Sequence, residues 1–499
     1  MLSTFTTMDL YLLSPMILLF IFSLVPVFTK VLNKNNEPSD MMSLYLPLIG
    51  IVFAFIATCG IILIKIVNGA PKLIFSGSIM VDGLAMWSVI IVLFITFFAL
   101  VLIKESSFTP KHLFSEYVML MLNAAVGMMV VAYSNDFILT FIGIEMASLC
   151  LYMLIAMSEE TRLSKEAAIK YFVLGSLASA ILLYGIAFIF GTTGTTQFAE
   201  ITETAATLAS TSRLFLVGCV LVFVGLGFKV SIFPFHFWTP DVYQGSSSPL
   251  TAFMAAGIKA VCFAALLRFF ATGFLAVDRA SGLVSTIQWL AVMSMMLGNI
   301  AALRQNHLKR ILAYSSIAHS GYLLMGLLVV GLSTNSVLGA SGTLFYLFSY
   351  AIMTIGAFGF LSLFEKSENS MVTVDHLKGL AYRRPYLALV ISIFMLSLAG
   401  IPPLLGFFSK FYIFSAAMKQ GLYWLVIWGV VSSVISVYFY LKPVVYMYMK
   451  QEDEALVGEF KDSASVSFTV GVSAALIVIV GLSSGPLYAL IRGSVLSLF

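Results

Sequence analysis

Four lysines and one glutamate stand inside long apolar stretches, where a charged side chain is costly. Lys229 lies in LVFVGLGFKVSIFPFHFW, Lys259 lies between TAFMAAGI and AVCFAALL, and Glu145 lies in NDFILTFIGIEMASLCLYMLIA. Lys410 follows a break in GIPPLLGFFSK, and Lys170 is the shallowest of the four lysines, about one turn inside its stretch. A lysine at the centre of a membrane span costs about 2.5–3.5 kcal/mol on insertion scales, so such residues mark functional pathways by default.

The chemistry that these residue types share is reversible proton uptake. Removal from water favours the neutral form of an amine or a carboxyl group, so a buried lysine can exchange a proton near neutral pH. Glu145 would take up a proton unless it pairs with a lysine on a neighbouring helix, and Lys229 is the best candidate. The alternative is structural ion pairing between helices. Several lysines against one carboxylate do not balance, so the pattern favours proton movement over ion pairing alone.

The remaining titratable residues add one candidate. His319, in YSSIAHSGYLLMG, could link Lys259 to Lys410 because histidine titrates near neutral pH, although a hydrogen-bonded core histidine is the simpler alternative. His236 and Asp241 fit capping and loop packing. The five histidines and four cysteines show no metal-ligand or C-x-x-C spacing, and no nucleotide-binding glycine motif occurs. The sequence therefore predicts no metal, redox or nucleotide site in this chain.

The elements that carry these residues are predicted to be membrane spans. The chain has 499 residues, 60% hydrophobic and only 10% charged, against about 25% charged in a soluble domain. Apolar runs of 18 or more residues recur throughout, and backbone groups in lipid must pair within a helix. We therefore predict an all-α integral membrane protein with about 14 spans. Their expected limits are 11–29, 42–66, 83–103, 115–133, 135–156, 166–190, 213–238, 248–272, 282–303, 308–330, 338–364, 385–416, 422–448 and 465–491.

The connections are short and polar. A Thr- and Gly-rich stretch around 191–212 predicts a short surface helix, and the segment around 72–82 predicts a small hairpin outside the cytoplasm. The first apolar run follows no basic segment or small-residue cleavage site, so it is predicted to be a retained span. A net charge of +4 without a basic, aromatic-rich cluster excludes nucleic acid as a partner and leaves membrane lipid.

Basic residues predict the orientation. One set of connections holds Lys30, Lys34, Lys104, Lys111, Arg162, Lys165, Arg304, Lys309, Arg310, Lys366, Lys378, Arg383, Arg384, Lys442, Lys450 and Lys461. The other set holds Lys65, Lys72, Arg213, Arg268, Arg279, Lys419 and Arg492. Because cytoplasmic loops carry the excess of Lys and Arg, both termini are predicted to lie on the periplasmic side.

Two spans contain prolines next to a buried lysine. Pro234 should free the carbonyl of Val230, and Pro402 with Pro403 should free those of Leu398 and Ala399. Simple kinks are the alternative. Two such spans lie five apart, which predicts two inverted five-helix repeats with broken seventh and twelfth helices. The expected division is an N-terminal three-helix segment over 1–114, a first half over 115–272, a second half over 273–448 and a C-terminal helix over 449–499.

Five segments together resemble one protein family. FIGIEMASLCLYML, KYFVLGSLASAILLYG, FKVSIFPFHFWTPDVYQG, LKRILAYSSIAHSGY and AGIPPLLGFFSKFY look like the subunit N family of bacterial respiratory complex I, the proton-pumping NADH:quinone oxidoreductase. The likeness covers nearly the whole chain and is weakest in the first hundred residues. Sibling antiporter-like subunits share single segments, but the chain ends after the fourteenth span, without a long lateral helix. It also has Lys410 where one sibling has a glutamate.

The resemblance implies a membrane-arm subunit in the bacterial inner membrane that moves protons while partner subunits reduce quinone. It implies that NADH, FMN, Fe–S clusters and quinone bind to those partners, and that the other membrane-arm subunits are its neighbours. By position, Glu145 would modulate Lys229, Lys259 would be the central relay, and His319 would link it to Lys410 at the exit. Lys170 is a further candidate on the same path.

Two other functions fit parts of the sequence. A subunit of a multisubunit sodium or potassium/proton antiporter would have the same fold without a redox partner. A non-transporting membrane scaffold would tolerate apolar replacement of its buried lysines.

Overall fold

The structure is a computed structural model that describes residues 6–32, 41–63, 71–104, 106, 109–158, 162–332, 337–365, 372–451 and 463–496. The long helices are α1 (Thr7–Leu32), α2 (Leu46–Leu63), α3 (Gly83–Ile103), α4 (Phe114–Tyr133), α5 (Phe137–Ala156), α6 (Arg162–Thr193), α12 (Ser281–Leu303), α13 (Leu308–Leu332), α14 (Val337–Leu361), α18 (Tyr423–Met449) and α19 (Ala464–Leu482). The shorter ones are α7 (Phe198–Thr211), α8 (Arg213–Lys229), α9 (Trp238–Gly245), α10 (Ser248–Phe253), α11 (Lys259–Ala271), α15 (Leu380–Arg383), α16 (Pro385–Ala399), α17 (Leu405–Lys419) and α20 (Ser484–Val495). Single turns are η1 (Met41–Tyr45), η2 (Lys111–Leu113), η3 (Met254–Ile258), η4 (Asp278–Ala280), η5 (Ser362–Phe364) and η6 (Val374–Leu377).

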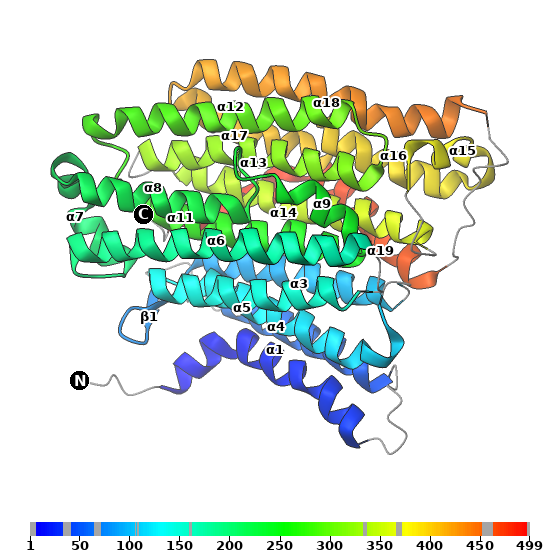
Figure 1. Cartoon of the computed structure of the whole chain (residues 1–499), viewed down its shortest axis with the longest axis horizontal. Helices are drawn as coiled ribbons and strands as arrows, with labels where there is room; N and C mark the ends of the chain where they lie inside the picture. The colour runs from blue at the N-terminus through cyan, green and yellow to red at the C-terminus, as the bar shows by residue number, and fades with distance from the viewer. Residues whose placement is uncertain are drawn as a thin grey trace.

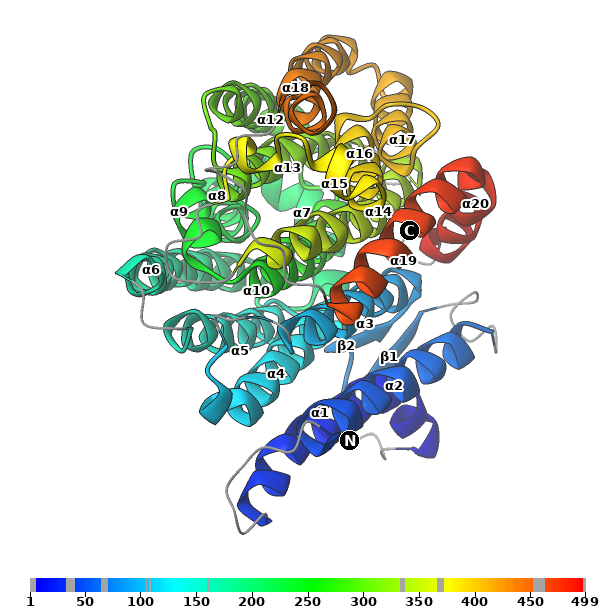
Figure 2. The ribbon, with the colours of Figure 1, turned by 90° about the vertical axis from the view of Figure 1, so that its right-hand side faces the viewer.

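The helices form one bundle that confirms the predicted all-α membrane architecture. They run side by side along the long axis, and both termini lie at the same end of the bundle (Figure 1). The end-on view shows α13 and α14 enclosed by the other helices (Figure 2). By length and composition, twelve helices of the described chain can cross a membrane, or up to thirteen if the bent pair α7–α8 counts as one span.

The predicted connections at the end of the bundle that carries the termini are confirmed. Strands β1 (Lys72–Ile74) and β2 (Ile79–Val81) form an antiparallel hairpin, as predicted around 72–82. Asn135 Nδ2 donates to the Gly77 carbonyl over 2.9 Å, and this contact fastens the hairpin turn to the loop before α5. Helix α7 occupies the predicted 191–212 stretch and meets α8 at a bend of 115°.

Two of the predicted spans are divided in the structure, which accounts for the smaller number of unbroken crossings. The predicted span 213–238 consists of α8 and a turn that leads into α9, and 385–416 consists of α16 and α17. The predicted breaks are therefore present, but Pro234, Pro402 and Pro403 lie in the connecting turns and not inside helices. Gly400 ends α16 with φ +88°, a left-handed conformation that glycine adopts without steric cost.

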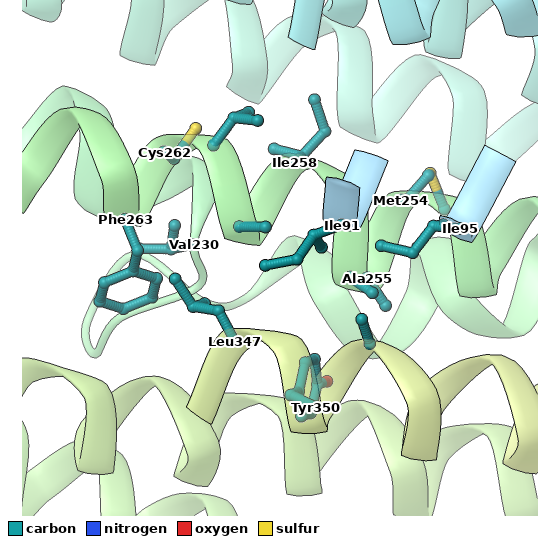
Figure 3. Packing of buried hydrophobic residues seen from close by; sticks show 14 of the residues in the cluster. Ile91, Ile95, Val230, Met254, Ala255, Ile258, Cys262, Phe263, Leu347 and Tyr350 are labelled. Atoms are coloured by element: carbon teal, nitrogen blue, oxygen red, sulfur yellow. The ribbon is translucent and has the colours of Figure 1, made fainter. Parts of the chain in front are cut away.

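The most deeply buried part of the bundle runs from α10 through η3 into α11. Every residue of Ser248–Phe270 is buried, and the π-helical turn η3 ends directly before Lys259. Figure 3 shows this stretch between Ile91 of α3 and Tyr350 of α14. A π-helical turn inside an α-helix commonly accompanies a functional site, because it changes the direction of the side chains that follow it.

Candidate functional site

Lys229 is the last residue of α8, and its ammonium group lies inside the protein. It donates to Ser148 Oγ of α5 over 2.9 Å and to the Tyr152 hydroxyl over 3.4 Å. Its distance to Glu145 Oε1 is 4.0 Å. The predicted Glu145–Lys229 neighbourhood is therefore present, with the carboxylate at the outer limit of an ion pair and the serine hydroxyl in closer contact.

The Glu145 side chain lies nearer the surface of the protein than the sequence predicted. Its side chain is 25% exposed, against 1% for Lys229, and it accepts a short hydrogen bond from Ser179 of α6. Ser148, which binds the lysine, follows Glu145 by one turn on the same helix, so α5 presents the carboxylate and the hydroxyl to one region. The carboxylate thus has a second partner that can hold it when the lysine is neutral.

The break after Lys229 connects this region to α13. The carbonyl of Val230, predicted to be free, accepts a hydrogen bond from Ser320 of α13. Trp238 Nε1 donates to the Phe228 carbonyl over 3.1 Å and holds the start of α9 against the end of α8. A buried carbonyl without a partner would be costly, so the Ser320 hydroxyl stabilises the break.

Lys259 makes its strongest contacts with a single residue of α13. Its ammonium donates to the Ser316 carbonyl over 2.6 Å and to Ser316 Oγ over 2.7 Å. It also lies 4.7 Å from the ring centre of Tyr350, in cation–π geometry. Ser320 Oγ lies 3.2 Å from the same Ser316 carbonyl, so the lysine and the first break meet at one turn of α13.

His319 follows Ser316 by one turn of α13 and lies among tyrosines. Its Nδ1 is 2.6 Å from the Tyr346 hydroxyl, and its Nε2 is 3.2 Å from the Tyr440 hydroxyl. The Tyr440 hydroxyl also contacts Ser315 Oγ. The imidazole therefore has a hydrogen-bond partner on each nitrogen, as a relay needs and as a satisfied core histidine would also have.

Lys410 of α17 closes the second break. Its ammonium donates to the Ala399 carbonyl over 2.9 Å and to Ser433 Oγ of α18 over 2.9 Å, and it lies 5.2 Å from the Tyr322 ring centre. Ala399 is one of the two residues whose carbonyls were predicted to be free. Tyr322 lies on α13, one turn after His319.

Helix α13 thus joins Lys229, Lys259 and Lys410, because each of these buried lysines contacts it directly or through an adjacent residue. Besides Lys309 in its first turn, its buried polar residues are Ser315, Ser316, His319, Ser320 and Tyr322. Among these only His319 was singled out from the sequence. The spacing in YSSIAHSGY, which puts hydroxyl groups one turn apart inside an apolar helix, was the signal for the others.

Lys170 differs from the other candidates. Its side chain is 39% exposed and pairs with Glu166 over 2.7 Å and with Asp241 over 2.6 Å. Asp241 also pairs with Arg310 over 2.9 Å. Unlike the other three lysines, Lys170 is therefore not enclosed by the protein and is paired with two acids.

Two buried ion pairs were missed by the sequence analysis, which treated Glu145 as the one deep acid. Asp82 is fully buried and binds Arg268 through both carboxylate oxygens, over 2.9 and 2.8 Å. Glu365 and Lys309 form a second pair, with side chains 1% and 6% exposed. The sequence analysis had assigned Arg268 and Lys309 to polar connections. Their acidic partners are distant in the sequence and meet them only in the folded bundle. Within the described residues, no group of three or more His, Cys, Asp or Glu side chains is placed to hold a metal ion.

Known proteins share both the sequence and this architecture. Residues 134–436 match the family described as NADH:quinone oxidoreductase/Mrp antiporter, TM. The chain is 49% identical to NADH-quinone oxidoreductase subunit N of Bdellovibrio bacteriovorus over 98% of both chains. A chain of respiratory complex I from Thermus thermophilus, solved with bound aureothin, is 30% identical and superposes with a TM-score of 0.80 over 96% of this chain and 100% of its own.

The likeness to a solved antiporter chain concerns the fold alone. A chain of the Mrp complex from Dietzia sp. superposes with a TM-score of 0.81 over 96% of this chain and 97% of its own, but is only 19% identical. Sequence identity therefore distinguishes the complex I relatives from the Mrp chain, whereas the fold alone does not. On the identity shared along almost its entire length, the chain belongs to the NADH-quinone oxidoreductase subunit N family of antiporter-like membrane subunits.

Proposed function

We propose that this chain translocates protons in the membrane arm of an NADH:quinone oxidoreductase, along Glu145, Lys229, Lys259, His319 and Lys410. The observation that carries the proposal is the row of three buried lysines, each bound to hydroxyls or carbonyls and all in contact with α13 or its neighbours. Of these three lysines, only Lys229 has a carboxylate within 4.0 Å in the described part of the chain, so charge neutralisation does not explain the row.

The direction of transfer follows from that asymmetry. While Glu145 stays near Lys229, the carboxylate stabilises the ammonium form of the lysine. When the two move apart, the ammonium loses this stabilisation and its proton passes through water molecules to the neutral amine of Lys259. The same exchange then passes the proton through the His319 region to Lys410. Each step breaks one N–H bond and forms another. The row returns to its starting state when Lys410 releases its proton and the row takes up a new one.

The rest of the complex supplies the driving reaction. NADH, FMN, Fe–S clusters and quinone would bind to partner subunits, and this chain would carry no redox centre of its own. The relatives are bacterial, which supports the inner membrane as the location. The excess of basic residues at the end of the bundle opposite the termini supports periplasmic termini. The two divided paths, α8–α9 and α16–α17, support the proposed halves over 115–272 and 273–448.

Lys259→Arg tests the function most directly. Arginine keeps the positive charge but does not release a proton, since its pKa lies above about 12. In membrane vesicles with equal amounts of assembled complex, we expect NADH-driven proton uptake to fall by roughly tenfold or more. Normal uptake would exclude Lys259 as a carrier. Proton uptake driven by a sodium or potassium gradient, in the absence of NADH, would favour the antiporter alternative.

A further inference from the structure

The buried pair Lys309–Glu365 lies at the start of α10, which continues through η3 into α11, the helix that begins at Lys259. Lys309 is in the first turn of α13, and Glu365 follows η5 at the end of α14. The Glu365 carboxylate accepts from the Ser248 backbone N–H over 2.9 Å and from Ser248 Oγ over 2.6 Å. Lys309 also donates to the Ser246 carbonyl over 2.7 Å. The pair therefore binds the residues directly before and within the first turn of α10.

Two fully buried hydroxyl groups beside this pair have no hydrogen-bond partner among the described residues. They are Tyr117 Oη of α4 and Ser247 Oγ. The Tyr117 hydroxyl lies close to the Ser247 and Ser158 side chains, and the Glu365 carboxylate acts on it electrostatically. Leaving a buried hydroxyl unpaired is costly, and a water molecule with several polar neighbours satisfies such groups. The surroundings of Glu365 thus have the composition of a small hydrated site.

Polar atoms lie between this site and Lys259 in two groups, one at the backbone of Tyr243 and one at its hydroxyl. Thr251 Oγ1 lies 2.8 Å from the Ser247 carbonyl and 3.4 Å from the Tyr243 carbonyl. The Tyr243 hydroxyl lies 3.4 Å from Ser316 Oγ, which accepts from Lys259 over 2.7 Å.

We propose that Glu365, held by Lys309, takes up protons from water at this end of the bundle and passes them to Lys259; this inference rests on the proposed function above. A proton from hydronium forms an O–H bond on the Glu365 carboxylate. That bond breaks as the proton moves through water and the hydroxyls of Tyr243 and Ser316, and an N–H bond forms on the neutral amine of Lys259. The carboxylate is regenerated and pairs again with the Lys309 ammonium.

The Asp82–Arg268 pair provides a matched control. It is as deeply buried, and the Asp82 carboxylate, like that of Glu365, accepts from a backbone N–H, here that of Ala85 over 2.8 Å. Its partner, however, is a guanidinium that does not release a proton. Arg268 lies at the other end of α11 from Lys259. Its hydrogen bonds join the two side chains to each other, to the Ala85 N–H and to the Ala132 carbonyl, and none of these partners is a hydroxyl. This pair joins α3 to α11 without providing a proton path.

The experiment compares double variants, so that no buried charge is left without its partner. Glu365→Gln with Lys309→Gln removes the proton carrier and keeps similar side-chain volumes, and Asp82→Asn with Arg268→Gln removes the control pair. Native gels measure assembled complex, and NADH-driven proton uptake is expressed per assembled complex. We expect the Glu365/Lys309 variant to lose roughly tenfold or more of this specific uptake, and the Asp82/Arg268 variant to keep it. Glu365→Asp, which preserves a carboxylate, should restore most of the uptake.

Each outcome decides between the explanations. If the Glu365/Lys309 variant assembles less but pumps normally per complex, the pair is structural and the inference is wrong. If both double variants lose specific uptake equally, the loss reports general damage and also overturns it. Lys259→Met in the same assay separates the two levels. If Lys259→Met pumps normally, the proposed function itself fails; if it is inactive while the Glu365/Lys309 variant pumps, only the uptake site fails.

Discussion

The ammonium group of Lys410 donates a hydrogen bond of 2.9 Å to the carbonyl of Ala399, the last residue of α16. A helix break leaves backbone carbonyls without hydrogen-bond partners, and here the buried ammonium group donates a hydrogen bond to one of them. The lysine and the break therefore form one structural unit. A neutral lysine amine can still donate this bond, so the contact survives when the proton leaves.

The first prediction concerns Lys410→Met. This substitution leaves the Ala399 carbonyl with only the Ser433 hydroxyl at 3.5 Å, so we expect a destabilisation of about 1–3 kcal/mol in addition to lost proton uptake. Lys259→Met is the matched comparison, because the Ser316 carbonyl keeps the Ser320 hydroxyl at 3.2 Å. Thermal unfolding of the detergent-solubilised complex should show the larger decrease for Lys410→Met. Equal decreases would contradict this role of the lysine.

The second prediction separates charge from proton exchange at Lys229. Lys229→Arg keeps a cation near Glu145, whereas Lys229→Met leaves the carboxylate with the Ser179 hydroxyl and no nearby cation from α8. If the lysine carries protons, both variants lose NADH-driven proton uptake by roughly tenfold or more in vesicles with equal assembled complex. If the lysine only joins helices, the arginine variant pumps normally. We expect the arginine variant to be inactive.

A third prediction tests the packing of the second break. A Cβ added to Gly406 would lie 1.8 Å from the Ser397 carbonyl oxygen, a backbone atom that cannot move aside alone. Gly406→Ala should therefore destabilise the subunit by about 1–3 kcal/mol through overpacking. Gly282→Ala is the control, since no atom lies within 4 Å of its added Cβ. The amount of assembled complex at raised temperature should fall for the first variant and not for the second.

The fourth prediction concerns the Asp82–Arg268 pair as a structural element. Asp82→Asn alone leaves a buried guanidinium without its counter-charge, which costs about 3–5 kcal/mol. The double variant Asp82→Asn with Arg268→Gln should recover most of the assembly lost in the single variant. A single variant that assembles as well as the unmodified chain would show that Arg268 reaches another anion or solvent.

The fifth prediction concerns orientation. A reporter fused after residue 499 should be active when it is a periplasmic enzyme and inactive when it requires the cytoplasm, because the positive-inside rule places the termini outside. A matched fusion in the connection that holds Arg383 and Arg384 should show the opposite activity. Activity of the cytoplasmic reporter at the C-terminus would reverse the proposed direction of proton uptake at Glu365.

The sequence by itself determined the membrane class, the helical architecture and the positions of the broken paths. Those properties depend on local patterns: apolar runs of span length, and prolines that cannot donate a backbone hydrogen bond. It also identified Lys229, Lys259 and Lys410, because a lysine in an apolar run is unusual whatever surrounds it. Each of these residues is buried in the structure.

Only the tertiary structure decided which partners these residues meet. The sequence could not show that Ser316 binds Lys259, since serine is common in membrane helices and the two residues are far apart in the chain. It did not show that Lys170 reaches Glu166 and Asp241 near the start of α6, and it missed Asp82–Arg268 and Lys309–Glu365. From the sequence, a charged residue near the end of a helix is predicted to be exposed to solvent. Packing against other helices decides whether it is buried and which partner it meets.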